Sequence, residues 1–346
     1  MTDRHHRILA SLVAEYIEQG APVSSAWLAE HSALGLSSAT VRNILARLEE
    51  QGLVHQPHTS AGRVPTDHGY RLYVDQLLTS RRRAKVLPAI EARLRQSGTI
   101  SDLLEQASQE LSRASHQIGF AVAPASPNVR IEHIDFVNLD GPRVLVIVVA
   151  TGGQITHRVI ETETRIDSTA LRQASNYITT HFAGLTLDEA RAAIVDRMRE
   201  ERMLYDALMS RALALAQRGL VEIQPQETVH VQGTSFLIEE LAGEPADQQQ
   251  TLGALRELVR MIEEKHHFID LLTRSIEAPG LSVVIGSEHN LPELRPFSVV
   301  VSTFHDGNRA GTVGVIGPTR MRYGRAISVV DGVSQLVTRF LEGQHD

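Results

Sequence analysis

The sequence contains no cysteine among its 346 residues. This absence excludes disulfides and thiolate-bound metals, and it leaves the cellular compartment otherwise open. No apolar run is long enough to cross a membrane, and the first residues, MTDRHHRILASL, lack the apolar core of a signal peptide. We therefore expect a cytoplasmic protein with no membrane partner, and its 42% hydrophobic content suffices for two or three packed domains.

Catalytic signatures are missing as well. The chain has no HExxH pair and no GxSxG elbow. Glu263 and His267 are one helical turn apart, a spacing that metal sites use, but no second histidine lies one turn from His267. A surface charge cluster explains this segment better than a ligand set. We expect a protein that is not an enzyme and has no metal or cofactor.

The chain also lacks the strong positive charge typical of nucleic-acid binders, since its net charge is −7. Residues 1–83 nevertheless hold nine Arg, no Lys and eight acidic residues, a balance of +1, whereas the remainder holds 25 basic and 33 acidic residues. The acidity therefore belongs to the other regions. A balance of +1 predicts modest DNA affinity for one domain, so that two copies are needed on one operator.

The first eighty residues have the pattern of a winged helix. Apolar residues recur at helical spacing over residues 8–17, Ser24 or Ser25 is suited to cap a second helix, and Ser37 or Ser38 a third. Short strands follow at about residues 53–56 and 63–64. The third helix has an apolar stripe at positions i, i+3, i+4 and i+7, namely Val41, Ile44, Leu45 and Leu48.

The opposite side of this third helix carries small and polar residues suited to a DNA groove. Asn43 can pair with adenine and Arg47 with guanine, while the capping Ser37 or Ser38 and the helix N-terminal amides suit phosphate oxygens. Thr40 and Arg42 flank this face. A solvated surface helix would show the same pattern, so the helix alone does not decide between the two interpretations.

The loop between the two short strands, residues 57–62, strengthens the DNA-binding interpretation. It has no acidic side chain and stands next to Arg63. We expect His58, Thr59, Ser60 and Arg63 to lie along phosphates or to enter a minor groove. The tip of an ordinary hairpin is also polar, but it would not usually lack acids throughout while following such a helix.

The segment TSAGRVPTDHGYRLYVDQLL, residues 59–78, resembles the family of the heat-inducible transcription repressor HrcA. Residues 37–52 and 283–341 resemble it too, so the resemblance runs the whole length and is strongest in the first eighty residues. It implies a dimeric winged-helix repressor that binds double-stranded DNA at an inverted repeat called CIRCE upstream of chaperone operons. It also implies dependence on the chaperonin GroEL as a partner.

Past the winged helix the pattern predicts an α+β chain with an interrupted sheet. A helical connector covers about residues 86–118, and strands follow at 131–138, 143–150 and 155–161, separated by the hairpin signals Asp140-Gly141 and Gly152-Gly153. Strands return only at 282–285, 298–304 and 310–315, before a helix that ends near Leu341. We predict a winged-helix domain over 1–80, a linker helix region over 81–118, one antiparallel-sheet domain in two halves, 119–164 and 278–346, and an inserted, mostly helical domain over 165–277.

The resemblance implies that this sheet domain is GAF-like and that the insertion dimerises. Two observations bear on those implications. The insertion contains a heptad seam, whose members are Ile194, Met198, Glu201, Tyr205, Leu208, Ala212 and Leu215. The seam fits either a helix pair across a two-fold axis or one helix packed in its own domain. The resemblance favours dimerisation. Because GAF-like domains often bind small molecules, the alternative function is a winged-helix regulator controlled by a ligand. Gly311, Gly314 and Gly317 do not form a dinucleotide pattern, and close backbone approach explains them better.

Overall fold

The computed structural model describes residues 3–58, 61–80, 88–123, 130–151, 154–201, 207–221, 228–236, 253, 256, 260, 280–290, 292–306 and 309–343. The chain divides into two compact units. The first unit combines residues 1–123 with 229–346, and the second consists of residues 124–228.

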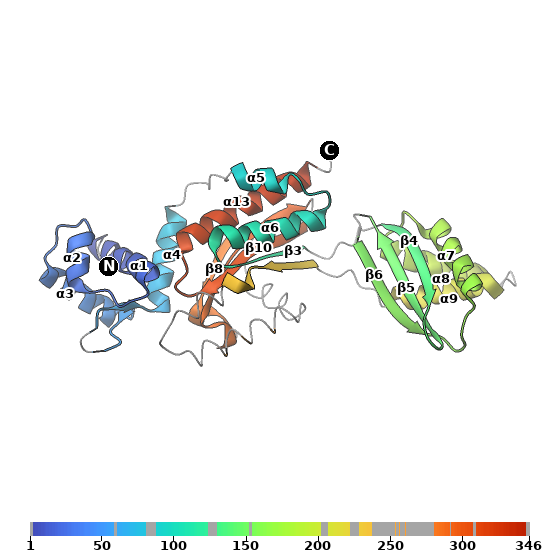
Figure 1. The fold of residues 1–346 in the computed structure, drawn as a ribbon, viewed down its shortest axis with the longest axis horizontal. Coiled ribbons are helices and arrows are strands. Elements are labelled where there is room, and N and C mark those ends of the chain that lie inside the picture. The colour runs from blue at the N-terminus through green and yellow to red at the C-terminus, as the bar shows by residue number, and fades with distance from the viewer. Residues whose placement is uncertain are drawn as a thin grey trace. The chain divides into compact units, whose positions relative to one another are not determined.

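The first unit begins with four helices and a two-stranded hairpin (Figure 1). The order of the first five elements is the one that the sequence predicts, and the strands pair antiparallel, Val54 with Pro65 and His55 with Val64. The bounds are α1 Asp3–Gln19, α2 Ser25–His31, α3 Ser38–Glu50, β1 Val54–His55, β2 Val64–Pro65 and α4 Asp67–Thr79.

Side-chain caps fix the beginnings of three of these helices. The hydroxyl oxygens of Ser24, Ser37 and Thr66 each accept a backbone N–H one turn into their helix, all at 3.2 Å. These contacts satisfy N–H groups that otherwise have no partner at a helix start. The apolar stripe predicted for α3 is confirmed as buried, and it shares one core with the stripe of α1; the members are Ile8, Leu9, Leu12, Val13, Val41, Ile44, Leu45 and Leu48.

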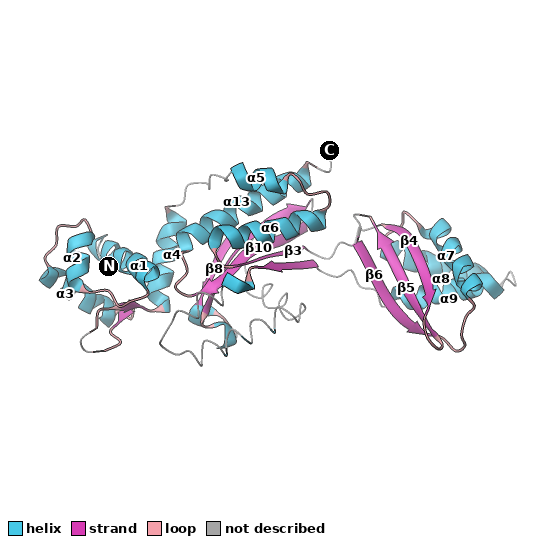
Figure 2. Ribbon diagram, viewed as in Figure 1, coloured by secondary structure: helices cyan, strands magenta, loops and turns pink. Residues whose placement is uncertain are grey.

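The remaining described residues of the first unit include a five-stranded sheet and three helices that cover one of its faces (Figure 2). Its strand order is β7-β3-β10-β9-β8, and the β3–β10, β10–β9 and β9–β8 pairs are antiparallel. The strands are β3 Ile118–Ala123, β7 Thr228–Gln232, β8 Leu281–Ile285, β9 Phe297–Asp306 and β10 Arg309–Pro318. The helices are α5 Pro88–Leu94, α6 Ile100–Ser115 and α13 Tyr323–Glu342, and two 3₁₀ turns cover Gly286–Glu288 and Pro292–Leu294.

The helices α5 and α6 differ in role from the expected linker helix region over 81–118. The helix α6 contacts β3, β10 and α13, and its apolar residues belong to the same buried core as the sheet. The reason is physical: the stripe of Leu103, Leu104 and Leu111 needs an apolar surface, and the sheet supplies it. These helices therefore form part of the sheet domain.

The glycines of β10 permit close packing between neighbouring strands, as the sequence suggested. A methyl group at Gly311 would come closer than 3.0 Å to the ring of Phe304, its partner on β9. A methyl group at Gly314 would meet the ring of Phe120 on β3 in the same way. Both glycines thus make room for an aromatic side chain of the adjacent strand.

The second unit is a three-stranded antiparallel sheet in the order β4-β5-β6, with helices packed against it (Figure 1). All three predicted strands are confirmed to within one residue. The bounds are β4 Ile131–Asn138, β5 Arg143–Ala150, β6 Gln154–Glu161, α7 Ser168–Phe182, α8 Leu187–Glu201 and α9 Ala207–Val221.

The strand pairing differs from the expected boundaries 119–164 and 165–277. The strands β4 to β6 form a sheet of their own and do not join the five-stranded sheet, which the chain leaves after β3 and rejoins at β7. The residues that interrupt the larger sheet therefore include these three strands as well as helices. Alternating hydrophobicity marks a strand but does not identify its partner, because the partner is chosen by long-range packing.

The predicted heptad seam falls on two separate helices. The helices α8 and α9 contact each other, and Ile194, Ala212 and Leu215 are buried in the core of the second unit. This part of the seam therefore packs inside one chain. Tyr205 lies outside the described residues, as do the side chains of Met198, Glu201 and Leu208.

Two further expectations concern absences. Glu263 and His267 lie outside the described residues, and no cluster of three potential metal ligands occurs within the part of the chain that the structure describes. Among the described helices, none combines the length and apolar character needed to cross a lipid bilayer.

Candidate nucleic-acid interface

The outer side of α3 presents the predicted polar side chains to solvent. Thr40, Arg42, Asn43 and Arg47 are all exposed, because the buried stripe occupies the opposite side of the helix. Neither Arg42 nor Arg47 forms an ion pair with any residue that the structure describes. Two guanidinium groups and one amide are thus available on a single exposed helix face.

The two serines at the start of α3 have different structural roles. The Oγ of Ser37 accepts the N–H of Thr40 and lies 2.9 Å from the Thr40 Oγ1, so Ser37 is the cap. The Oγ of Ser38 lies 3.3 Å from the Oγ of Ser25 and links α3 to α2. The first backbone N–H groups of the helix therefore stand at an exposed end, where an anion is stabilised by the helix dipole.

The hairpin loop after α3 is held at its base by a glutamine. Gln56 donates from Nε2 to the carbonyl oxygen of Ala61 at 2.9 Å, and the carbonyl of His58 accepts the N–H of Ala61 at the same distance. The side chain of His58 is exposed. Thr59 and Ser60, also predicted to contact DNA, lie outside the described residues.

The structure gives Arg63 an acidic partner that the sequence did not reveal. Its Nη2 lies 2.8 Å from the Oε2 of Glu49, at the end of α3. The other oxygen of Glu49 accepts the backbone N–H of Gln56 at 3.1 Å. The backbone of Arg63 is fixed too, because its N–H and carbonyl both bond to Val23 at 2.9 Å.

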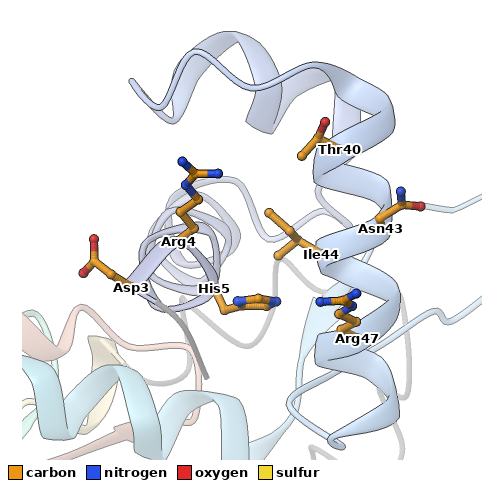
Figure 3. Close-up of a pocket in the computed structure, with 7 residues that line it drawn as sticks. All are labelled: Asp3, Arg4, His5, Thr40, Asn43, Ile44 and Arg47. Atoms are coloured by element: carbon orange, nitrogen blue, oxygen red, sulfur yellow. The ribbon is translucent and has the colours of Figure 1, made fainter.

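A hollow of about 580 Å³ separates the exposed side of α3 from the first turn of α1 (Figure 3). Figure 3 shows His5 directed towards α3 on the side of Arg47, and Asn43 directed away from α1. Partial burial, together with the positive charge of Arg47, lowers the pKa of His5. The lining residues are Asp3, Arg4, His5, Thr40, Asn43, Ile44 and Arg47.

The contribution of α1 to this region was not predicted from the sequence. Arg4 is exposed beside the hollow, so a cation of α1 stands close to the polar side of α3. The run Arg4-His5-His6-Arg7 was the available signal. Its significance depends on how α1 crosses α3, which hydrophobic spacing does not specify.

The helix α4 attaches these N-terminal elements to the five-stranded sheet. The Nε of Arg71 donates to Glu288 Oε1 at 2.6 Å, and its Nη2 donates to the carbonyl of Val283 at 2.6 Å and pairs with Glu288 Oε2. The hydrogen bond to Glu288 raises the pKa of Arg71. In addition, Asp67 accepts the N–H of Ser287 at 2.8 Å. The polar side of α3 is therefore carried on a firmly attached module.

Comparison with known proteins gives consistent matches. The family model described as HrcA protein C terminal domain matches residues 101–327. A protein of Geobacter sulfurreducens named heat-inducible transcription repressor HrcA is 40% identical over 347 residues, covering 99% of each chain. A protein of the same name from Xanthomonas campestris pv. campestris is 37% identical, covering 98% of this chain and 95% of that one.

One solved structure, described as that of a hypothetical protein, shares the fold of the chain. The two superpose with a TM-score of 0.68 and 22% sequence identity, over 99% of each chain.

Proposed function

Because the chain belongs to the HrcA family of heat-inducible transcription repressors, we propose that it represses heat-shock chaperone operons by binding an inverted-repeat operator, CIRCE, as a dimer. The observation that carries this proposal is the exposed face of α3, opposite a buried apolar stripe; it bears one asparagine and two arginines that form no ion pair with a described residue. The repressor family is not a class of enzymes, and we propose no catalytic role.

In this proposal residues 1–80 are a winged-helix domain and α3 enters the major groove. Asn43 and Arg47 contact base edges, since Asn suits adenine and Arg suits guanine. Arg42, Thr40 and the helix start at Ser37 contact phosphates, which position the helix without reading sequence. Ser38 supports the helix start through Ser25.

Two further elements flank the groove. The loop carrying His58, Thr59 and Ser60 is the wing and lies along the phosphate backbone. Arg4 of α1 adds a cation on the other side of α3. The low positive charge of the region is consistent with modest affinity per copy, which two linked copies on one operator raise by avidity.

The outer face of the three-stranded sheet supports a dimer interface. Val137, Ile155 and Val159 are 40%, 64% and 47% exposed, although they are large apolar side chains. Leu145 pairs with both Val137 and Val159 across the strands, and Ile155 pairs with Val149 on the same face of the sheet. The opposite face of this sheet packs against α7 to α9. A second copy of the outer face would cover the exposed apolar residues in a two-fold arrangement, which makes this unit the inserted dimerisation domain.

The two-fold arrangement has a consequence for the operator. Two copies related by a two-fold axis read the same bases on opposite strands, so the half-sites form an inverted repeat. Their centres are an integral number of helical turns apart, each turn being about 34 Å along the duplex. In the same proposal the five-stranded sheet with α5, α6 and α13 is the GAF-like domain.

Two parts of the proposal rest on the family alone. Activity depends on the chaperonin GroEL, and the protein acts in the cytoplasm, where a bacterial repressor meets its operator. No described contact bears on the chaperonin, so the functional experiment includes it as a separate arm.

The experiment is a gel-shift titration of the full-length protein on three duplexes of equal length. One carries the inverted repeat, one the same half-sites as a direct repeat, and one a scrambled sequence. We expect a clear preference for the inverted repeat, increased by chaperonin after a heat step. Equal affinity for the direct repeat would contradict the two-fold model, and full binding without chaperonin after the heat step would contradict the chaperonin dependence alone.

A further inference from the structure

One carboxylate ties both ends of the wing, defined here as residues 56–63, to the end of α3. Glu49 accepts the N–H of Gln56 through Oε1 at 3.1 Å, where the chain enters the wing. It pairs with Nη2 of Arg63 through Oε2 at 2.8 Å, where the chain leaves it. Gln56 also closes the base of the wing through its bond to Ala61. A single side chain of α3 thus contacts both ends of the wing.

The surroundings of Arg63 oppose a role for it as a phosphate contact. Its side chain is only 20% exposed, and its Nε is buried. Its backbone is paired with Val23, and Gly62 packs so closely that a methyl group there would come within 3.0 Å of the Val23 carbonyl oxygen. The guanidinium is therefore directed to Glu49 on a segment that cannot swing outward without breaking several bonds.

We propose that Glu49 is a positioning residue for DNA binding, because its contacts with Gln56 and Arg63 form a clasp on the wing. In this proposal Arg63 contacts Glu49 instead of a phosphate. The clasp fixes the two ends of the wing relative to α3, so that α3 and the wing contact the same duplex together. Preorganisation of this kind strengthens binding because the wing does not have to be ordered during association. The inference rests on the proposed function, since it concerns how the winged helix meets DNA.

The sign of a substitution distinguishes this proposal from simple electrostatics. A carboxylate near DNA repels phosphates, so its neutralisation should strengthen binding if repulsion were its only effect. Glu50 is the matched control, because it is the next residue of α3, is exposed, and makes no ion pair with the residues that the structure describes. The clasp predicts that Glu49→Gln weakens operator binding about fivefold, the factor equivalent to about 1 kcal/mol, whereas Glu50→Gln leaves it unchanged or stronger.

The arginine side of the clasp gives a second test. Arg63→Gln should weaken binding by a similar factor. The double variant with Glu49→Gln should bind no more weakly than either single variant, because all three lose the ion pair between Glu49 and Arg63. The salt dependence of binding should stay as in the wild type. Loss of a direct phosphate contact would instead reduce the slope of log affinity against log salt by about 1.

Amide hydrogen exchange of the full-length protein without DNA completes the experiment. The clasp predicts faster exchange at the N–H of Gln56 in Glu49→Gln and not in Glu50→Gln, since Glu49 accepts that N–H and the single carbonyl oxygen of a glutamine cannot serve both Gln56 and Arg63. Arg63→Lys, which keeps the charge but loses the planar fork, should give intermediate affinity, and it replaces Arg63→Gln should that variant fail to fold.

The outcomes distinguish a failure of the clasp proposal from a failure of the proposed function. The clasp is overturned if Glu49→Gln and Glu50→Gln strengthen binding alike, or if Arg63→Gln lowers the salt slope by one unit. If the wild type binds no inverted repeat at all, the proposed function fails, and the exchange at Gln56 still reports whether Glu49 holds the wing.

Discussion

Replacement of Gly69 by alanine tests how tightly α4 packs on Leu53, which precedes the wing. Gly69 lies in the first turn of α4, where helix propensity alone would favour alanine by about 1 kcal/mol. The structure reverses that expectation. A methyl group there would come closer than 3.0 Å to the carbonyl oxygen of Leu53, which accepts the N–H of Thr66 at 3.1 Å. The methyl group therefore has to displace backbone that is hydrogen-bonded.

The magnitude follows from three contributions. Overpacking against a fixed group costs about 1 to 3 kcal/mol, and weakening the hydrogen bond to Leu53 costs about 1 kcal/mol, while the helix gains back about 1 kcal/mol. We expect Gly69→Ala to lower the free energy of unfolding by about 2 kcal/mol. Gly324→Ala is the matched control, because Gly324 is also near the start of a helix, is exposed, and has nothing within 4 Å of an added methyl group.

The assay is urea unfolding followed by the fluorescence of Trp27, which is the only tryptophan of the chain and lies in α2. This probe reports on the N-terminal module without interference from the second unit. Gly324→Ala should leave the midpoint unchanged or raised. If Gly69→Ala is as stable as Gly324→Ala, the described packing of α4 on the residues before the wing is incorrect.

Three further predictions concern the contact of α4 with Glu288, the five-stranded sheet domain and the dimer. Arg71→Ala should lower the free energy of unfolding by about 2 kcal/mol in the same urea assay, because Glu288 loses a charged partner that is only partly screened by solvent, whereas Arg42→Ala should change it by less than about 0.5 kcal/mol. Burial lowers the pKa of His289, so the unfolded chain takes up a proton first as the pH falls, and the free energy of unfolding should drop below pH ~6.5. His289→Gln should flatten the profile of stability against pH between pH 7.5 and 5.5. An unchanged profile would show that His289 does not cause this drop. Val159→Asp should shift the full-length protein from dimer to monomer in sedimentation equilibrium without loss of helix content, and a persistent dimer would exclude the outer sheet face as the interface.

Local signals in the sequence predicted the N-terminal module well. The caps at Ser24 and Ser37 and the buried stripe of α3 depend on residues within one or two helical turns of each other. Such short-range chemistry can be interpreted without knowledge of the rest of the fold. The exposed polar side of α3 follows directly, because its position is fixed once the buried stripe is known.

Long-range pairing was the part that the sequence did not determine. The strands β4 to β6 were predicted nearly to the residue, but their separation from the larger sheet depends on β3 and β7, which had not been recognised as strands of that sheet. The strand β3 is buried along most of its length, so it shows no alternation of apolar and polar residues. The expected connector ended at about residue 118, and no strand was predicted between it and residue 131.

In the functional region, too, short-range features could be predicted from the sequence and long-range contacts could not. Asn43 and Arg47 could be placed from helical spacing, whereas the partner of Arg63 could not, because Glu49 belongs to another element and meets it only through the turn of the chain. The proximity of Arg4 to α3 likewise depends on a helix crossing. Side chains whose roles depend on a second element therefore require the structure.

The central claim is that the exposed side of α3 reads DNA sequence, and selection of binding sites from random duplexes tests it most directly. The full-length wild type should enrich one inverted repeat whose half-sites are an integral number of turns apart. Asn43→Ala and Arg47→Ala should each relax the preference at particular bases, while Arg42→Ala weakens binding to all sites alike. Enrichment of no common sequence, or a selected sequence that both Asn43→Ala and Arg47→Ala leave unchanged, would contradict the account.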